Sequence, residues 1–504
     1  MLEHSILGTL YNYWIHSFVF SILQRIFHPL LNAARNSAII RFLFHEGAAE
    51  RAFRASGTAK LIRKISDALL WIMGRFRGLV DAAEESFLIR AARGSVLRCI
   101  ASFEGLFGAF LFVMFVTPHH YWNNLFSVMA AFLFLLLYLL LAAAGKRKFA
   151  PPELLGLGGF LFLLALVLSM GFTHAPTDSL RILLFFLASF AFCYVIAADF
   201  REPEKLRRLL AFLYAALIIV SLGGIAQRAL HLVKANASFT DLELNAGMPG
   251  RVYSTLDNPI NLSEFVLLFL PLGAAFAAGA KKPFLRVVLA AGLVFPALAL
   301  VLTYSRGGWI AVCIAAVVFT WCCNKRLLPA LAVLGVLALP LLPSSVMARI
   351  STIGNRQDSS TQHRLDIWKG VLRILSDHDR FLTGIGLGPS TFRIVYPFYS
   401  LGTAKVGAYH SQLHYLELIL ETGLLGLLSF LYMMCKYLGR AADAMRRSAW
   451  EHRLILIACI SSLAALAFVG LVEYVWFYQR IMFAFFIFLG ILLAAAGAPE
   501  QERR

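Results

Sequence analysis

The most constraining feature of the sequence is a series of apolar segments long enough to cross a lipid bilayer. A helix needs about 20 predominantly apolar residues to span the hydrocarbon core, and from residue 97 onward such segments follow one another. The chain of 504 residues is 60% hydrophobic and 15% charged, more apolar surface than a soluble core hides. The sequence therefore predicts an all-α polytopic membrane protein with about twelve transmembrane helices, at 97–117, 123–144, 153–172, 179–198, 206–226, 259–280, 285–304, 308–323, 327–343, 411–437, 453–475 and 480–497.

The orientation of these spans follows from the distribution of basic residues. Lys and Arg gather on alternate connections, so that all of these clusters fall on one side of the membrane. Because cytoplasmic loops carry the excess of Lys and Arg, we predict that this side and both termini are cytoplasmic. The formal net charge of +18 has the same explanation, and no nucleic-acid partner is expected. The largest external segment is then 344–410.

The first 95 residues differ from the rest. Apolar residues recur there at helical spacing among many Lys and Arg side chains, a composition typical of amphipathic helices on an anionic surface. The alternative is a poorly ordered basic extension. We therefore divide the chain into a basic N-terminal extension on the cytoplasmic membrane surface (1–95), nine spans (96–343), the large external loop (344–410) and the last three spans with a short tail (411–504). The spans 308–323 and 327–343 are short and are expected to be tilted or partly re-entrant.

Three arginines stand out on the predicted external side, because its short connections carry few cations. Arg306 lies in the turn between two apolar spans, and an ionisable group at that depth indicates function. Alternatively, its side chain extends to lipid headgroups or pairs with a carboxylate. Arg251 is followed by Asn258-Pro259, which is also ordinary chemistry for the start of a helix. Arg364 lies in the long external segment, where charged side chains are usually only solvated.

A second group of polar residues opens the predicted span 411–437. His410, His414, Glu417 and Glu421 are four, three and four positions apart, which predicts one shared side of a helix. Two histidines four apart can hold a metal, but no further ligand stands nearby in the sequence, so no metal cofactor is expected. These side chains either line a contact between helices or supply a general base, because a neutral histidine accepts a hydroxyl proton.

External arginines beside a candidate base favour one type of reaction. Nucleotide-activated substrates are not normally present outside the cytoplasm, so a group transfer there needs a donor that the membrane delivers already activated. A polyprenyl-diphosphate-linked sugar meets this need. Guanidinium groups stabilise the negative charge that grows on the departing diphosphate, and this requires no metal ion.

Four motifs, in order, resemble the O-antigen ligase and polymerase superfamily over about residues 100–495. They are Arg251-Val252-Tyr253-Ser254 with Asn258-Pro259-Ile260-Asn261, Thr303-Tyr304-Ser305-Arg306-Gly307-Gly308-Trp309, Gly384-Ile385-Gly386-Leu387-Gly388 with Phe392, and His410 to Gly426, which ends in Glu421-Thr422-Gly423-Leu424-Leu425-Gly426.

The resemblance implies a metal-independent membrane glycosyltransferase with a GT-C-like fold in the bacterial inner membrane. Its donor would be a glycan on undecaprenyl diphosphate, and its acceptor a hydroxyl of lipid A-core or another cell-surface glycan. Arg251, Arg306 and Arg364 would bind the diphosphate. When the sequences are aligned on Glu421-Thr422-Gly423, the family's usual His-Asn pair falls on Gln412-Leu413, so the catalytic histidine is expected to be His410 or, alternatively, His414. The residues expected to support them are Tyr253, Ser305, Glu417 and Glu421.

Three other functions remain open at the level of the sequence. A polymerase of the same superfamily, which joins two polyprenyl-linked glycans, has the same motifs. A transporter of an anionic solute also needs arginines near helix ends, although few charges lie at mid-span and no internal repeat is evident. A membrane scaffold gives no reason for the glycine-rich segment in the large external loop.

Overall fold

The computed structural model describes residues 36–85, 102–234, 249–351, 359–377, 379–401 and 408–501, and four isolated positions nearer the N-terminus. This part of the chain is built of helices, and it contains no strand. Ten of its helical stretches are long and apolar enough to cross a membrane. The predicted all-α polytopic membrane fold is therefore confirmed. Most of residues 1–35 and all of 86–101, for which the sequence predicts amphipathic helices, lie outside the described residues.

The observed spans match the predicted ones closely, with two differences. Helix α9 (Phe103–Val116) has 14 residues and rises about 21 Å, less than the ~30 Å of a hydrocarbon core. The predicted spans 308–323 and 327–343 form one apolar stretch of 33 residues, broken where Asn324 is extended. The candidate spans are α10 (Asn124–Ala143), α11 (Gly156–Ser169), α12 (Pro176–Asp199), α13 (Pro203–Ala229), α14 (Pro259–Ala278), α15 with α16 (Pro283–Gly292, Val294–Leu302), α17 with α18 (Arg306–Asn324, Leu328–Ala338), α23 (His414–Met445), α24 (Trp450–Val469) and α25 (Gln479–Gln501).

Local sequence explains where many spans begin. Helices α12 to α15 each start with a proline, whose fixed φ suits the first helical position and whose missing N–H has no partner there anyway. The Asn258 side chain caps α14 by accepting from the Ile260 N–H at 2.8 Å. The start of α14 is thus fixed by residues that directly follow the Arg251 motif.

Helices α12 and α25 pack side by side at the centre of the bundle, and α25 is the most deeply buried span. Aromatic side chains join them to their neighbours. The Trp476 ring, just before α25, contacts Phe430 of α23 with ring centroids 5.2 Å apart, and Phe430 lies 5.6 Å from Phe162 of α11. This aromatic packing holds the beginnings of α23 and α25 together, where the candidate site lies.

Buried ion pairs connect several helices at the opposite end of the bundle. Arg147 lies 2.5 Å from Glu104 of α9 and 3.0 Å from Asp199 of α12, and Lys205 of α13 lies 3.3 Å from Asp199. These contacts belong to two of the Lys- and Arg-rich connections on which the predicted orientation rests. Their cations therefore also stabilise helix packing.

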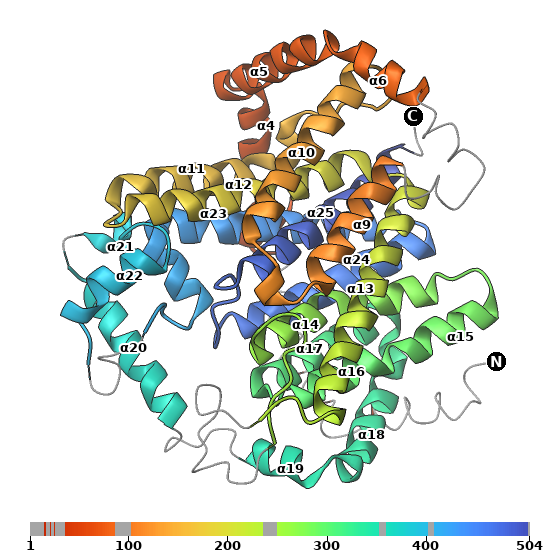
Figure 1. Ribbon diagram of the computed structural model, residues 1–504, viewed down its shortest axis with the longest axis vertical. Coiled ribbons are helices and arrows are strands. Elements are labelled where there is room, and N and C mark those ends of the chain that lie inside the picture. The colour runs from red at the N-terminus through yellow and green to blue at the C-terminus, as the bar shows by residue number, and fades with distance from the viewer. Residues whose placement is uncertain are drawn as a thin grey trace.

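The N-terminal helices α3 (Ala38–Phe44), α4 (Ala48–Ala55), α5 (Gly57–Gly74) and α6 (Arg77–Glu85) include the red helices α4 to α6 at the top of Figure 1. A buried contact attaches them to α23. Lys436 lies 2.8 Å from Glu50 and donates to the Phe42 and His45 carbonyl oxygens, each at 2.6 Å. Burial alone raises the Glu50 pKa, but hydrogen bonds from Lys436 and Tyr432 lower it to about 2.

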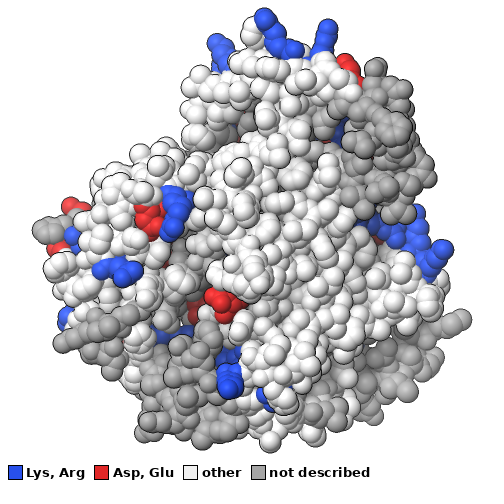
Figure 2. All heavy atoms as spheres, in the orientation of Figure 1, with Lys and Arg blue, Asp and Glu red and all other residues white. Residues whose placement is uncertain are grey.

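The described part of segment 344–410, which the sequence predicts to be external, contains four α-helices: α19 (Ser344–Ser351), α20 (Ser359–Leu375), α21 (Arg380–Thr383) and α22 (Pro389–Val395). Apolar side chains of α20 and α22 pack with Leu420 of α23. In Figure 1, α20 to α22 lie at the left, beyond the ends of α11 and α23. Figure 2 shows a broad uncharged surface across the middle of this face, with Lys and Arg gathered at its upper edge over the N-terminal helices.

Candidate active site

Arg251 lies beside the turn that carries Arg306. The Arg251 side chain is buried, and its Nε donates to the Thr303 carbonyl oxygen at 2.7 Å. The neighbouring Val252 N–H donates to the Leu302 carbonyl oxygen at 3.3 Å. These bonds tie the segment before α14 to the turn between α16 and α17. Two motifs that are about 50 residues apart in the sequence thus form one structural unit.

The turn that precedes Arg306 has a defined shape. Tyr304 adopts φ 51°, which reverses the chain after α16, and the Ser305 side chain caps α17 by accepting from the Gly308 N–H at 3.2 Å. A Cβ on Gly308 would come 2.0 Å from Oγ of Ser263 on α14, so only glycine permits this close helix packing. Arg306 is the first residue of α17, and its position is fixed by the backbone on both sides.

Four arginines from four segments gather at this place, and we call them the arginine cluster: Arg251, Arg306, Arg349 and Arg364. Burial and the positive charges of the other three arginines together lower the pKa of Arg251 to about 9, while the Glu473 carboxylate acts in the opposite direction. The other three guanidinium groups are therefore near enough to Arg251 to repel it. Such a concentration of cations favours an anionic ligand.

Arg364 links the arginine cluster to the segment that carries His410. Its Nη2 lies 2.5 Å from Oε1 of Glu473, and its Nε donates to Oε1 of Gln412 at 3.1 Å. One turn further along α20, the Trp368 indole N–H donates to the Ser411 carbonyl oxygen at 3.0 Å. Helix α20 therefore holds residues 410–412 against the connection between α24 and α25.

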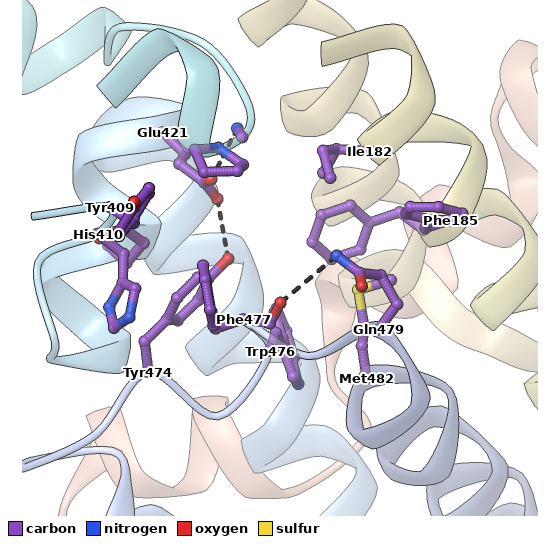
Figure 3. A pocket seen from close by; sticks show the side chains of 14 residues that line it. Ile182, Phe185, Tyr409, His410, Glu421, Tyr474, Trp476, Phe477, Gln479 and Met482 are labelled. Atoms are coloured by element: carbon purple, nitrogen blue, oxygen red, sulfur yellow. Dashed lines mark hydrogen bonds between the residues drawn. The ribbon is translucent and has the colours of Figure 1, made fainter. Parts of the chain in front are cut away.

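A narrow pocket lies beside His410 (Figure 3), and its polar lining includes His410, Glu417, Glu421 and Tyr474. Its apolar wall comes from α12 and from the segment before α25. The cavity measures about 20 Å³, room for roughly one water molecule. The pocket therefore admits a hydroxyl group, while the body of a sugar would stay outside it.

Glu421 is positioned by two hydrogen bonds at the back of the pocket. Its Oε1 accepts from the Gly388 N–H at 2.8 Å, and its Oε2 accepts from the Tyr474 hydroxyl at 3.3 Å. Burial and the charge of Glu421 raise the pKa of Tyr474 well above its ordinary value. Tyr474 therefore keeps its proton and remains a donor to Glu421.

The glycine-rich segment 384–388 supports the start of α23. Its Ile385 and Gly386 N–H groups donate to the Leu420 and Glu421 carbonyl oxygens at 2.8 and 3.2 Å. Gly388 has φ 94°, which disfavours any side chain. Because these N–H groups bond to α23, the segment acts as a support for Glu421, not as a phosphate-binding loop.

Comparison with known protein families agrees with this arrangement. Residues 291–431 match the family model described as O-antigen ligase. A search of curated proteins found no match. The predicted resemblance to this superfamily is therefore confirmed over the matched residues, and because members of the matching family are membrane glycosyltransferases, it supports an enzyme.

The matched region contains Arg306, Arg349, Arg364 and His410, while Arg251 and Glu473 lie on either side of it. Both outer residues nevertheless reach the same place in the fold. The site thus extends beyond the matched residues at both ends. Among the residues that the structure describes, no group of three or more His, Cys, Asp or Glu has the arrangement of a metal site.

The two candidate histidines have different surroundings. The prediction that His410, His414, Glu417 and Glu421 share one helix is only partly right, because α23 begins at His414 and His410 precedes it. His410 lines the pocket. His414 is buried, and its ring lies 4.4 Å from that of Trp476 and 5.8 Å from that of Tyr474. The geometry favours His410 as the histidine that meets a substrate.

Glu417 and Tyr253, two of the predicted supporting residues, take part in hydrogen bonds that fix the backbone near the site. Oε2 of Glu417 accepts from the Ser411 N–H at 2.5 Å, which fixes the chain just after His410. The Tyr253 N–H donates to Oε1 of Gln227 at 3.1 Å. Gln227, at the end of α13, also accepts from the Ser254 N–H at 2.7 Å and so holds the Arg251 segment in place.

Sequence reasoning missed Arg349 and Glu473. Arg349 follows the turn at Arg306 by about 40 residues, and its sequence had no feature that set it apart from other loop arginines. The Tyr304 hydroxyl bonds to Oγ of Ser345 at 2.9 Å, which brings α19 to the site. Glu473 fell inside the predicted span 453–475, whereas α24 ends at Val469. A carboxylate near the end of an apolar run was the signal that it lies outside the span.

Proposed function

We propose that this protein transfers a glycan from undecaprenyl diphosphate to a hydroxyl group of lipid A-core or another cell-surface acceptor, on the outer face of a bacterial inner membrane. The observation that carries the proposal is the arginine cluster, in which the charges of Arg306, Arg349 and Arg364 all act on the buried guanidinium of Arg251. A diphosphate placed there would be attracted by all four cations. Guanidinium groups bind phosphate oxygens by paired, charge-assisted hydrogen bonds.

The reaction consists of one substitution at the anomeric carbon of the donor. The bond from this carbon to the diphosphate oxygen breaks, and a bond to the acceptor oxygen forms. The electron pair leaves with the diphosphate, whose growing charge the arginine cluster stabilises. The acceptor proton passes to a base in the pocket.

Two pocket groups can take this proton, His410 and Glu421, and we assign it to His410. Nδ1 of His410 accepts from the Gln412 N–H at 3.0 Å, so the neutral ring in this structure carries its hydrogen on Nε2. Proton uptake at Nε2 requires the other tautomer and loss of the Gln412 bond. Glu421 accepts a proton without such a change, and the two assignments are tested below.

The orientation rests on the two ends of α23. The helix starts beside His410, is kinked at Gly423, and ends at the Lys- and Arg-rich connection before α24. If the basic end faces the cytoplasm, the arginine cluster faces outward, where a lipid-linked donor is presented.

The decisive experiment uses purified protein in nanodiscs with a polyprenyl-diphosphate oligosaccharide and a lipid A-core acceptor. We expect a glycosylated acceptor and free polyprenyl diphosphate, without added metal. Lengthened donor chains in the absence of the acceptor would instead identify a polymerase. Uptake of an anionic solute into vesicles, with neither product, would refute group transfer.

A further inference from the structure

A large cavity lies at the end of the bundle opposite the candidate active site, and we call it the basic cavity. It measures about 1250 Å³ and lies between helices α3 to α5, the ends of α12, α23 and α25, and the connection that follows α10. The proposed reaction uses none of its residues. Its charged lining consists of Arg54, Arg63, Lys148, Arg201, Arg440, Arg447, His45, Glu46, Glu153 and Asp443.

Among the described residues that line the cavity, cations outnumber acids by six to three. The acids already have partners: Glu46 contacts both Arg54 at 2.7 Å and Arg440 at 3.4 Å, and Glu153 contacts Arg63. Asp443 lies 3.4 Å from Nδ1 of His45. The acids therefore leave an excess of positive charge that faces the cavity, which suits an anion.

The surroundings favour a lipid phosphate over a soluble one. Phe149, Leu154 and Leu493 also line the cavity and give it an apolar side. Arg63 projects into it from α5, whose other face exposes Leu61 and Ile65, with 57% and 52% of their surface accessible. An amphipathic helix with such an apolar stripe lies in the plane of a bilayer at headgroup depth. The basic cavity beside it therefore opens among lipid headgroups.

We propose that the basic cavity binds the phosphate headgroup of an anionic phospholipid, and that the bound lipid holds α3 to α5 against α23. A basic pocket beside transmembrane helices is a known form of lipid headgroup recognition. The lipid would complement the buried contact between Glu50 and Lys436, which fastens α4 to the same helix.

The test measures thermal unfolding and lipid retention of the full-length protein in detergent. Phosphatidylglycerol, phosphatidylcholine and inorganic phosphate are added separately, and native mass spectrometry counts bound lipids. We expect phosphatidylglycerol alone to raise Tm and to remain bound. Equal stabilisation by inorganic phosphate would show that a soluble anion is the ligand, and equal stabilisation by phosphatidylcholine would show no headgroup preference. Either result overturns the proposal.

Variants then locate the site. Arg201→Gln with Arg447→Gln removes two cavity cations, and Lys281→Gln with Lys282→Gln is the matched control, because these lysines lie outside the cavity on the connection between α14 and α15. We expect phosphatidylglycerol affinity to fall at least tenfold in the first double variant and to stay unchanged in the second. If the first double variant misfolds, Arg447→Gln alone is used, because that side chain is exposed. Unchanged affinity in the cavity variant, or an equal loss in the control, overturns the proposal.

Discussion

Replacement of Arg306 by alanine tests the role of the arginine cluster most directly. The side chain is partly exposed, whereas the turn that positions it is held by other groups: the Ser305 cap and the bond from Arg251 to the Thr303 carbonyl oxygen. These contacts remain in Arg306→Ala. We therefore expect the free energy of unfolding to change by less than about 1 kcal/mol.

The expected loss of catalysis is much larger. In the proposed reaction Arg306 is one of four guanidinium groups that stabilise the departing diphosphate. Removal of one preorganised donor from developing negative charge costs about 3–4 kcal/mol, or roughly 10²- to 10³-fold in kcat. Arg306→Lys keeps the charge but lacks the planar fork that binds two oxygens. We expect an intermediate loss, on the order of tenfold, or about 1.4 kcal/mol.

The assay is single-turnover transfer from a fluorescent polyprenyl-diphosphate oligosaccharide in nanodiscs, with a thermal melt of each variant. Arg373→Ala is the matched control, because Arg373 lies on α20 with its side chain exposed. Normal turnover by Arg306→Ala would refute the diphosphate role. An equal loss in Arg373→Ala would mean that general charge, not the arginine cluster, is responsible.

Three further predictions concern other parts of the structure. Burial and the charge of Arg364 lower the pKa of His410 to about 3, so the ring is neutral above that value, and we expect kcat/KM to stay flat from pH 5 to 8. His410→Gln should then lower kcat/KM by about 10²- to 10⁴-fold without a new titration limb. Wild-type rates in His410→Gln, together with a full loss in Glu421→Gln, would make Glu421 the base. Gly388→Ala adds a Cβ 2.9 Å from Cγ1 of Ile182 at φ 94° and should lower the free energy of unfolding by about 1–3 kcal/mol, seen in a thermal melt. Gly171→Ala, with open space around it, should leave it unchanged. Equal Tm values for both variants would contradict the strain argument. The pKa of Glu50 falls from its ordinary 4.5 to about 2 when Glu50 contacts Lys436. Attachment of the N-terminal helices to α23 should therefore be complete above pH 4.5 and be lost as the pH falls toward 2. The loss would be seen as faster hydrogen exchange in residues 38–55, and exchange that does not change over this range would refute this prediction.

The sequence predicted the features that depend on local composition. Apolar length located the spans, and Asn258-Pro259 marked the start of α14. The depth of Arg306 between two spans drew attention to a turn that the structure joins to Arg251. Such inferences succeed because the physical cause, burial in lipid or a helix cap, lies within a few residues of the signal.

The contacts that complete the site depend on tertiary packing and were not visible in the sequence. Arg349 reaches the arginine cluster because Tyr304 bonds to Ser345 across 41 positions, and Glu473 meets Arg364 across 109. Neither pairing has a periodic signature. The same holds for Glu50 and Lys436, which are nearly 400 positions apart.

The arrangement of the arginine cluster explains how four like charges persist in one place. The Arg251 guanidinium is held by a backbone carbonyl, and Arg364 by a glutamine and a carboxylate. These acceptors fix the side chains, while the charges of the other three arginines still lower the pKa of Arg251. In the proposed reaction a diphosphate relieves this repulsion, and its leaving group, with more negative charge, relieves it further. Stabilisation therefore increases along the reaction, which is the condition for an interaction to accelerate it.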